Sequence, residues 1–185
     1  MKKTILTLAA VFFAIANQAA ELDINGGFDK VNAKTGRPAN WNFNNWVLYR
    51  PFPKVQVTAP ENESKVLHIS DVKGQRGTEL CFSKPFPAVA GDTITVTAQV
   101  KGKGSAVFGI QLRDAKNNFT GYSKRGGSKK LTGEWKDVKV SFKVTDNKKS
   151  PTRFISVTFG CNTGNELFIR NIKAEHTAAA APAVQ

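Results

Sequence analysis

Residues 93–100 read Thr-Ile-Thr-Val-Thr-Ala-Gln-Val and alternate polar and apolar side chains with a period of two. Successive side chains of a β-strand point to opposite faces of its sheet, so this alternation predicts a strand with one face in a core and the other toward solvent. Burial on one face only is typical of antiparallel sheets. This segment therefore favours antiparallel β-structure over a helical or parallel-sheet fold.

The same alternation recurs along the chain, and turn-forming Gly, Pro, Asn and Asp residues separate its occurrences. It is clear at residues 108–113, 138–144 and 155–159, and shorter candidate strands lie at 55–58, 65–70, 78–83 and 166–173. After residue 20, we find no segment with a helical period of 3.6. About eight strands with frequent turns predict an all-β fold, a two-sheet antiparallel β-sandwich.

The chain begins with a leader and ends in a low-complexity tail. Residues 1–20 combine a Lys-Lys pair, an apolar stretch and a final Ala-Ala before Glu21, which predicts a bacterial signal peptide and export to the periplasm or beyond. One domain of residues 21–176 follows, and residues 177–185 (TAAAAPAVQ) predict a flexible tail. No later apolar run approaches the roughly 20 residues that span a bilayer, so transmembrane insertion is not predicted.

Cys81 and Cys161 are the only cysteines of the chain. An exported protein meets oxidising conditions, which permit a disulfide between them. The alternative is a pair of separate buried thiols that act as small apolar side chains. The sequence leaves both arrangements open.

A series of short motifs gives the chain a family resemblance. In order, they are NGGFD at 25–29, GRPANW at 36–41, VAGDTITVTA at 89–98, LTGEWK at 131–136 and LFIRNI at 167–172. This order resembles the bacterial carbohydrate-binding modules that accompany glycanases. The resemblance implies a galactose-binding-like jelly roll, a glycan partner, and Trp41 and Trp135 as scaffold residues. It also implies a structural calcium held by an Asp of the last motif, but Arg170 stands in that position. We therefore predict no cofactor, with a structural calcium as the alternative that the resemblance leaves open.

Enzymatic chemistry is not predicted. The chain has two histidines, and their spacing to each other and to the cysteines does not match a metal site. It lacks the G-x-S-x-G and H-E-x-x-H motifs and a phosphate-binding glycine loop. None of the 14 carboxylates is distinguished by its setting as half of a glycosidase pair. We therefore predict a binding module without catalytic residues.

Candidate sugar-binding residues come from two segments. Aromatic rings cover the apolar face of a sugar, and planar polar groups fix its hydroxyls. Trp46 and Tyr49 lie in the stretch WNFNNWVLYR at 41–50, where rings alternate with asparagines. Gln111 and Arg113 point away from the apolar positions of their strand, and Tyr122, with Phe119, flanks the next loop. The alternatives are core packing for Trp46 and a solvated sheet face for Gln111, Arg113 and Tyr122.

The chain is strongly basic, with 27 Lys and Arg against 14 Asp and Glu and a formal net charge of +13. Lys124, Arg125, Lys129 and Lys130 form a candidate anion-binding loop, which favours an acidic polysaccharide as partner. Export argues against nucleic acid. A like-charged soluble surface without a specific partner is the alternative for the loop. For the whole domain, the alternative is docking to another cell-envelope protein without sugar binding.

Overall fold

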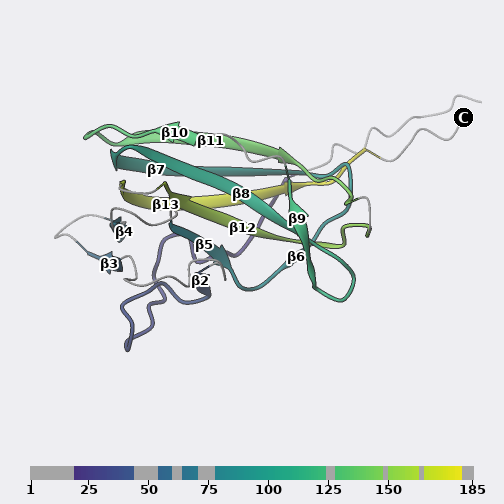
Figure 1. Ribbon diagram of the computed structural model, residues 1–185, viewed down its shortest axis with the longest axis horizontal. Helices are drawn as coiled ribbons and strands as arrows, with labels where there is room; N and C mark the ends of the chain where they lie inside the picture. The colour runs from purple at the N-terminus through teal and green to yellow at the C-terminus, as the bar shows by residue number, and fades with distance from the viewer. Residues whose placement is uncertain are drawn as a thin grey trace, which may run out of the picture.

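The computed structural model describes residues 19–43, 54–59, 64–70, 78–123, 128–147, 150–162 and 165–180. All the regular elements in these ranges are β-strands, as the alternation of the sequence predicts. They contain no helix of the length and apolar character that would cross a membrane. The long strands β7, β8, β12 and β13 run along the longest axis of the molecule (Figure 1).

The strands form two antiparallel sheets, which confirms the predicted β-sandwich. The first sheet has the order β11 (Lys136–Lys143), β7 (Thr93–Lys103), β13 (Glu166–Thr177), β4 (Val66–Ser70) and β3 (Lys54–Thr58), and β1 (Ala20–Glu21) also pairs with β13. The second sheet has the order β10 (Ser128–Lys130), β8 (Ser105–Arg113), β12 (Phe154–Cys161), β5 (Thr78–Phe82) and β2 (Trp41–Phe43). In addition, β9 (Phe119–Tyr122) pairs with β8, and β6 (Phe86–Pro87) pairs with β12.

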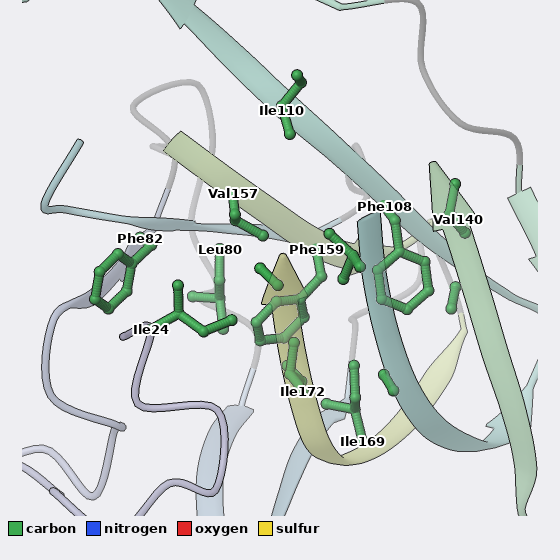
Figure 2. Close-up of a cluster of buried hydrophobic side chains, with 14 of the residues drawn as sticks. Ile24, Leu80, Phe82, Phe108, Ile110, Val140, Val157, Phe159, Ile169 and Ile172 are labelled. Carbon is green, nitrogen blue, oxygen red and sulfur yellow. The ribbon is translucent and has the colours of Figure 1, made fainter. Parts of the chain in front are cut away.

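The core lies between the two sheets and is built by the apolar halves of the alternating strands. On β7, Ile94, Val96, Ala98 and Val100 are buried, and the residues between them are partly exposed. Figure 2 shows Phe108 and Phe159 of the second sheet pointing into the same cluster as Ile169 and Ile172 of β13. The apolar area removed from water in this cluster is the main stabilising contribution to the fold.

Trp41 closes one end of the core, as the sequence predicted. Its side chain is 2% exposed, and its ring makes edge contacts with Phe82 and Phe159 at centroid distances of 5.2 and 4.6 Å. The indole Nε1 donates a hydrogen bond to the Ile24 carbonyl oxygen at 2.9 Å. A buried indole needs such an acceptor, so this contact fixes the chain near Ile24 against β2.

The first and second sheets differ on their outer faces. On β11 the residues that face away from the core are exposed or partly exposed, whereas β12 is buried from Ile155 to Cys161 on both faces. The outward-facing Ser156 and Thr158 are 0% and 1% exposed. An ordinary sandwich leaves the outer face of a sheet in water, so burial of polar side chains there distinguishes this part of the second sheet from the first.

The structure contradicts the disulfide between Cys81 and Cys161. Both residues lie on paired strands, but Cys81 is opposite Thr158 and Cys161 is opposite Thr78. The two cysteines are therefore three positions apart along the strands, or about 10 Å, whereas a disulfide needs Cα atoms within about 7 Å. Cys161 is 2% exposed, in agreement with the alternative of a buried thiol at that position.

A buried carboxylate fastens the end of β13. Asp92 is 3% exposed, and its Oδ2 lies 2.9 Å from Nε2 of His176. Asp92 also accepts hydrogen bonds from the backbone amides of Val89 and Ala179, each at 2.9 Å. Thr177 and Ala179, which the sequence assigned to the tail, are thus attached to the sandwich through β13 and Asp92.

Candidate functional site

A polar cluster lies on the outer face of the second sheet, where β8, β9 and β12 meet. We define it as Gln111, Arg113, Tyr122 and Ser156. Arg113 Nη2 donates to Gln111 Oε1 at 2.9 Å, and Arg113 Nε donates to Ser156 Oγ at 3.2 Å. Gln111 Nε2 is 3.5 Å from the hydroxyl oxygen of Tyr122. The structure therefore brings together three of the residues that the sequence singled out.

Strand register explains how these side chains meet. Ile110 and Leu112 enter the core, so the strand period of two places Gln111 and Arg113 on the outer face. Gln111 is directly opposite Ser156 on β12 and Tyr122 on β9. Residues opposite each other on paired strands are close enough to interact, so the cluster follows from the pairing of three strands.

A turn after β8 holds the outer end of Arg113. Arg113 Nη1 donates to the carbonyl oxygen of Asn117 at 3.0 Å, and Asn117 has a positive φ of 63°. The carboxylate of Asp114 accepts hydrogen bonds from the backbone amides of Lys116 and Asn118, both at 2.9 Å. Hydrogen bonds from the Asn118 amide and side chain lower the pKa of Asp114. The turn is thus closed by a charged acceptor, and the guanidinium of Arg113 is held from three sides.

Burial sets the electrostatic character of the cluster. Gln111 is 3% exposed, which differs from the solvated sheet face that was the alternative for this residue. Arg113 and Tyr122 are partly exposed. Hydrogen bonds to a partly desolvated guanidinium are stronger than the same bonds in water. The buried Gln111 is therefore held in a fixed position, and solvent can reach the cluster at Arg113 and Tyr122.

An exposed aromatic ring stands beside the cluster. Phe119 is 52% exposed and is opposite Arg113 in the strand register. Its ring meets that of Tyr122 edge to face, at a centroid distance of 5.2 Å and an interplanar angle of 68°. Two rings and a polar cluster on one strand edge provide an apolar surface next to fixed donors and acceptors.

Small residues continue the face along β8 and β12. Gly109 is opposite Thr158, and Val107 is opposite Gly160. Thr158 Oγ1 is buried and has no hydrogen-bond partner within the described part of the chain. A Cβ atom added at Gly109 would lie 2.9 Å from that oxygen, so a larger residue would displace the Thr158 hydroxyl. Because Gly109 has no side chain, nothing projects from the outer face of β8 at this position.

Other predicted site residues lie elsewhere or outside the description. Trp46, Tyr49, Lys124 and Arg125 fall outside the described residues. Lys129 and Lys130 are exposed on β10, opposite Ala106 and Ser105 at the start of β8. The six strand positions between residues 105 and 111 place them about 20 Å from the polar cluster.

The sequence does not identify Ser156 as a residue of this site, and it names Phe119 only as a neighbour of Tyr122. Ser156 was read only as a polar alternate of its strand, because nothing local states which strand pairs with it. Phe119 was placed beside Tyr122, and only its 52% exposure distinguishes it from a core ring. An aromatic residue within a Gly-, Asn- and Thr-rich segment is the signal that could have identified Phe119.

The residues around Arg170 do not fit the calcium site that the resemblance implies. The guanidinium carbon of Arg170 lies 4.2 Å from the ring centroid of Trp135, and its Nε donates to Gln99 Oε1 at 2.9 Å. A fixed positive charge in this place repels a divalent cation, which needs oxygen ligands. In the described ranges, no group of three or more His, Cys, Asp and Glu residues is arranged to hold a metal ion.

Comparisons with known proteins place this geometry among solved structures. No protein-family model and no curated protein matches the chain. The CBM22-1 xylan-binding domain from Paenibacillus barcinonensis Xyn10C matches with a TM-score of 0.52 and 13% identity, over 78% of this chain and 90% of that one. A CBM29-2 mutant complexed with mannohexaose matches with a TM-score of 0.52 and 12% identity, over 91% and 99%.

The chain has the fold of these carbohydrate-binding modules. The resemblance drawn from the sequence motifs is confirmed at this level. The same fold also occurs in a cyclase from Fischerella sp. TAU, with a TM-score of 0.61 and 12% identity over 89% of this chain and 100% of that one. One fold can host several functions, so the function rests on the chemistry of the site.

Proposed function

We propose that the chain is an exported, non-catalytic carbohydrate-binding module whose ligand lies on the outer face of the second sheet. The observation that carries this proposal is the Arg113–Gln111–Tyr122 network beside the exposed ring of Phe119. The ligand class is a poly- or oligosaccharide, and the basic composition favours one with acidic groups.

The orientation of Gln111 suits hydroxyl recognition. A guanidinium has only donors, so the group that faces Arg113 at 2.9 Å must be the amide oxygen. The Nε2 group then points toward Tyr122, whose hydroxyl can both donate and accept. A sugar hydroxyl that replaces or extends this weak 3.5 Å contact would meet groups already in position, which lowers the entropic cost of binding.

The aromatic edge supplies the apolar part of the recognition. The exposed face of Phe119 can cover the C–H groups of a pyranose ring, and Tyr122 fixes the tilt of Phe119 through their edge contact. The names of two structural neighbours support the same ligand class, since one is a xylan-binding domain and the other is complexed with mannohexaose.

The cyclase neighbours provide a second candidate, in which this face binds a small aromatic molecule and acts on it. Acid–base chemistry needs a carboxylate, histidine or similar group at the site. The polar cluster itself, Gln111, Arg113, Tyr122 and Ser156, contains no carboxylate, histidine or cysteine. We therefore favour binding over catalysis.

Affinity electrophoresis in gels that contain xylan, glucomannan or polygalacturonate tests the proposal. We expect retardation by at least one polymer, and a loss of about tenfold in affinity for Phe119→Ala, because one stacking ring contributes about 1–1.5 kcal/mol. Val89→Ala is the matched control, since Val89 is 46% exposed, lies in the turn before β7 and is not part of the polar cluster or its aromatic edge.

A second variant keeps the test independent of any one residue. Gln111→Ala should lose binding of xylan or glucomannan, and Gln99→Ala on the other sheet should retain binding of these two polymers. Absence of retardation by all three polymers, or equal losses for Phe119→Ala and Val89→Ala, would contradict the proposal. A thermal shift of the chain by 4-(1H-indol-3-yl)butan-2-one, a ligand of a cyclase neighbour, would favour the second candidate instead.

Export is tested separately by expressing the full chain in a bacterium. We expect the protein in the periplasm or medium with Glu21 as its first residue, measured by intact-mass spectrometry. A chain that remains in the cytoplasm with Met1 and the leader attached would contradict this part of the proposal.

A further inference from the structure

The outer face of the first sheet carries polar and charged side chains in consecutive rungs across its strands. One rung holds His68, Phe168 and Lys101 on β4, β13 and β7. The next holds Arg170, Gln99 and Asp137, and the third holds Lys173, Thr97 and Lys139. Strand pairing therefore places His68 and Phe168 at one end of this face, the aromatic end. It places Lys139 and Lys173 at the other, the lysine-flanked end.

At the aromatic end, the rings are covered by other side chains. The rings of His68 and Phe168 stack with a centroid distance of 4.2 Å and an interplanar angle of 5°. Lys101 Nζ lies 4.9 Å from the Trp135 centroid and 5.5 Å from the Phe168 centroid, and Arg170 covers the Trp135 ring at 4.2 Å. These cation–π contacts hold two positive groups in defined places on the face.

At the lysine-flanked end, a hollow lies over three neighbouring strands, β11, β7 and β13. It is lined by Thr97, Gln99, Asp137, Lys139, Asn171 and Lys173 and has a volume of about 440 Å³. Lys139 and Lys173 are both exposed and stand on either side of Thr97, about two strand spacings or 10 Å apart. The ladder is irregular between Arg170 and Lys173, where Asn171 has a positive φ of 53° and donates from Nδ2 to Gln99 Oε1 at 3.3 Å.

The charges of this face are unbalanced. On its described strands, its cations are Lys101, Lys103, Lys139, Lys143, Arg170 and Lys173, and its carboxylates are Glu21, Asp137, Glu166 and Glu175. Glu166 Oε1 lies 2.8 Å from His68 Nε2, and Asp137 Oδ1 accepts a hydrogen bond from Gln99 at 3.1 Å. The face therefore carries more positive than negative charge. Amide and hydroxyl groups lie between its lysines.

We propose that this face is a second binding face, which takes an acidic polysaccharide with Lys139 and Lys173 across the hollow. Lysines attract carboxylate or sulfate groups, and Thr97, Gln99 and Asn171 can bond the hydroxyls between those groups. The inference does not rest on sugar binding by the second sheet, because it uses different residues on the opposite side of the sandwich.

Two other polyanions fit this face less well. An anionic membrane surface favours an apolar anchor next to the cations, but the exposed large apolar residues of the described ranges are Val31, Val89 and Phe119, none of which is on this face. Single-stranded nucleic acid stacks its bases on open aromatic faces. Here Lys101 and Arg170 occupy the Trp135 ring.

Native gels that contain dextran sulfate or polygalacturonate test this proposal with two double variants of equal net charge. Lys139→Gln/Lys173→Gln removes the lysines beside the hollow, and Lys34→Gln/Lys84→Gln removes two exposed lysines elsewhere. We expect the first pair to weaken retardation about tenfold, because it removes two charge contacts with the polymer, and the second pair to change it less than about twofold. All four lysines are exposed, so both proteins should keep the wild-type circular dichroism and midpoint of unfolding.

Three results would overturn the proposal. The first is no retardation of the wild-type chain by either polymer, and the second is an equal loss for the two double variants, which would indicate net charge alone. The third is stronger binding to phosphatidylserine vesicles or to a single-stranded oligonucleotide than to either polymer. Phe119→Ala separates the two faces, because it should weaken binding of a neutral glycan and leave dextran sulfate retardation unchanged.

Discussion

A hydrogen-bonded arginine–glutamine pair occurs on the outer face of each sheet, and the two pairs lie in different environments. On the second sheet, Gln111 accepts from Arg113 at 2.9 Å and is 3% exposed. On the first sheet, Gln99 accepts from Arg170 at 2.9 Å, but Gln99 is partly exposed and also donates to Asp137. Equal distances do not mean equal energies, because water competes for the exposed pair and not for the buried one.

The environments also give the two pairs different tasks. Around Gln111 the residues on the paired strands, Ser156 and Tyr122, are uncharged, so the Gln111 amide and the Arg113 guanidinium are the main polar features of that face. Around Gln99 the neighbours are lysines and carboxylates, so charge dominates. We infer that hydrogen-bond geometry governs recognition on the second sheet and long-range charge governs it on the first.

The largest expected effect is a difference in the free energy of unfolding between variants of the two arginines. Arg113→Met should lower the free energy of unfolding by about 2–4 kcal/mol, because it leaves the buried Gln111 oxygen and Ser156 hydroxyl without their donor. Arg170→Met should cost about 1 kcal/mol or less, since it loses a surface cation–π contact and an exposed bond. Urea unfolding measures both, and equal losses would remove the distinction between the faces.

The buried carboxylate of Asp92 makes the stability of the fold depend on pH. Burial raises the pKa of Asp92, but hydrogen bonds from the Val89 and Ala179 amides and from His176 outweigh it, and the net pKa is lowered. A carboxylate with a lowered folded pKa contributes stability above its unfolded pKa of about 3.9 and loses that contribution as pH falls through the folded value.

Asp92→Asn should therefore cost about 1–3 kcal/mol at pH 7, because an amide nitrogen cannot accept the bonds that the carboxylate accepts. The difference between variant and wild type should shrink as the pH falls below about 3.9. Urea unfolding at a series of pH values measures it. A difference that stays constant down to the lowest pH would show that the charge of Asp92 contributes nothing.

Two aromatic residues, one on the outer face of each sheet, should respond differently to truncation. Phe168→Ala should lower stability by about 1 kcal/mol, because Phe168 stacks on His68 and lies under Lys101. Phe119→Ala should lower it by less than about 0.5 kcal/mol, since surface residues with few contacts have small effects. Thermal unfolding and glycan retardation should rank the variants in reverse order, and the same ranking in both would contradict separate roles.

The smallest expected effect is that of salt concentration, which tests both faces in one experiment. Raising sodium chloride from about 0.05 to 0.5 M shortens the screening length from about 14 to about 4 Å, so dextran sulfate retardation through the first sheet should weaken severalfold. Binding of a neutral glycan through the second sheet should change by less than about twofold. Gels run at both salt concentrations measure this, and parallel losses for the two ligands would argue for a single charged site.

The sequence determined the strands and the face that each side chain occupies. A period of two at residues 93–100, 108–113, 138–144 and 155–159 is a local property, and the structure has β7, β8, β11 and β12 there. Because Ile110 and Leu112 must enter the core, Gln111 and Arg113 were bound to share the outer face. Trp41 was likewise readable as a core residue from its motif.

Only the tertiary structure decided which strands pair and in what register. The sequence contains no local signal that Gln111 is opposite Ser156, or that Cys81 and Cys161 are three positions out of line on adjacent strands. Register depends on contacts between residues about 45 and 80 positions apart, which one strand's alternation does not encode. The burial of Gln111 and the lysine-flanked hollow at Thr97 both follow from that register, because each is formed by three strands at once.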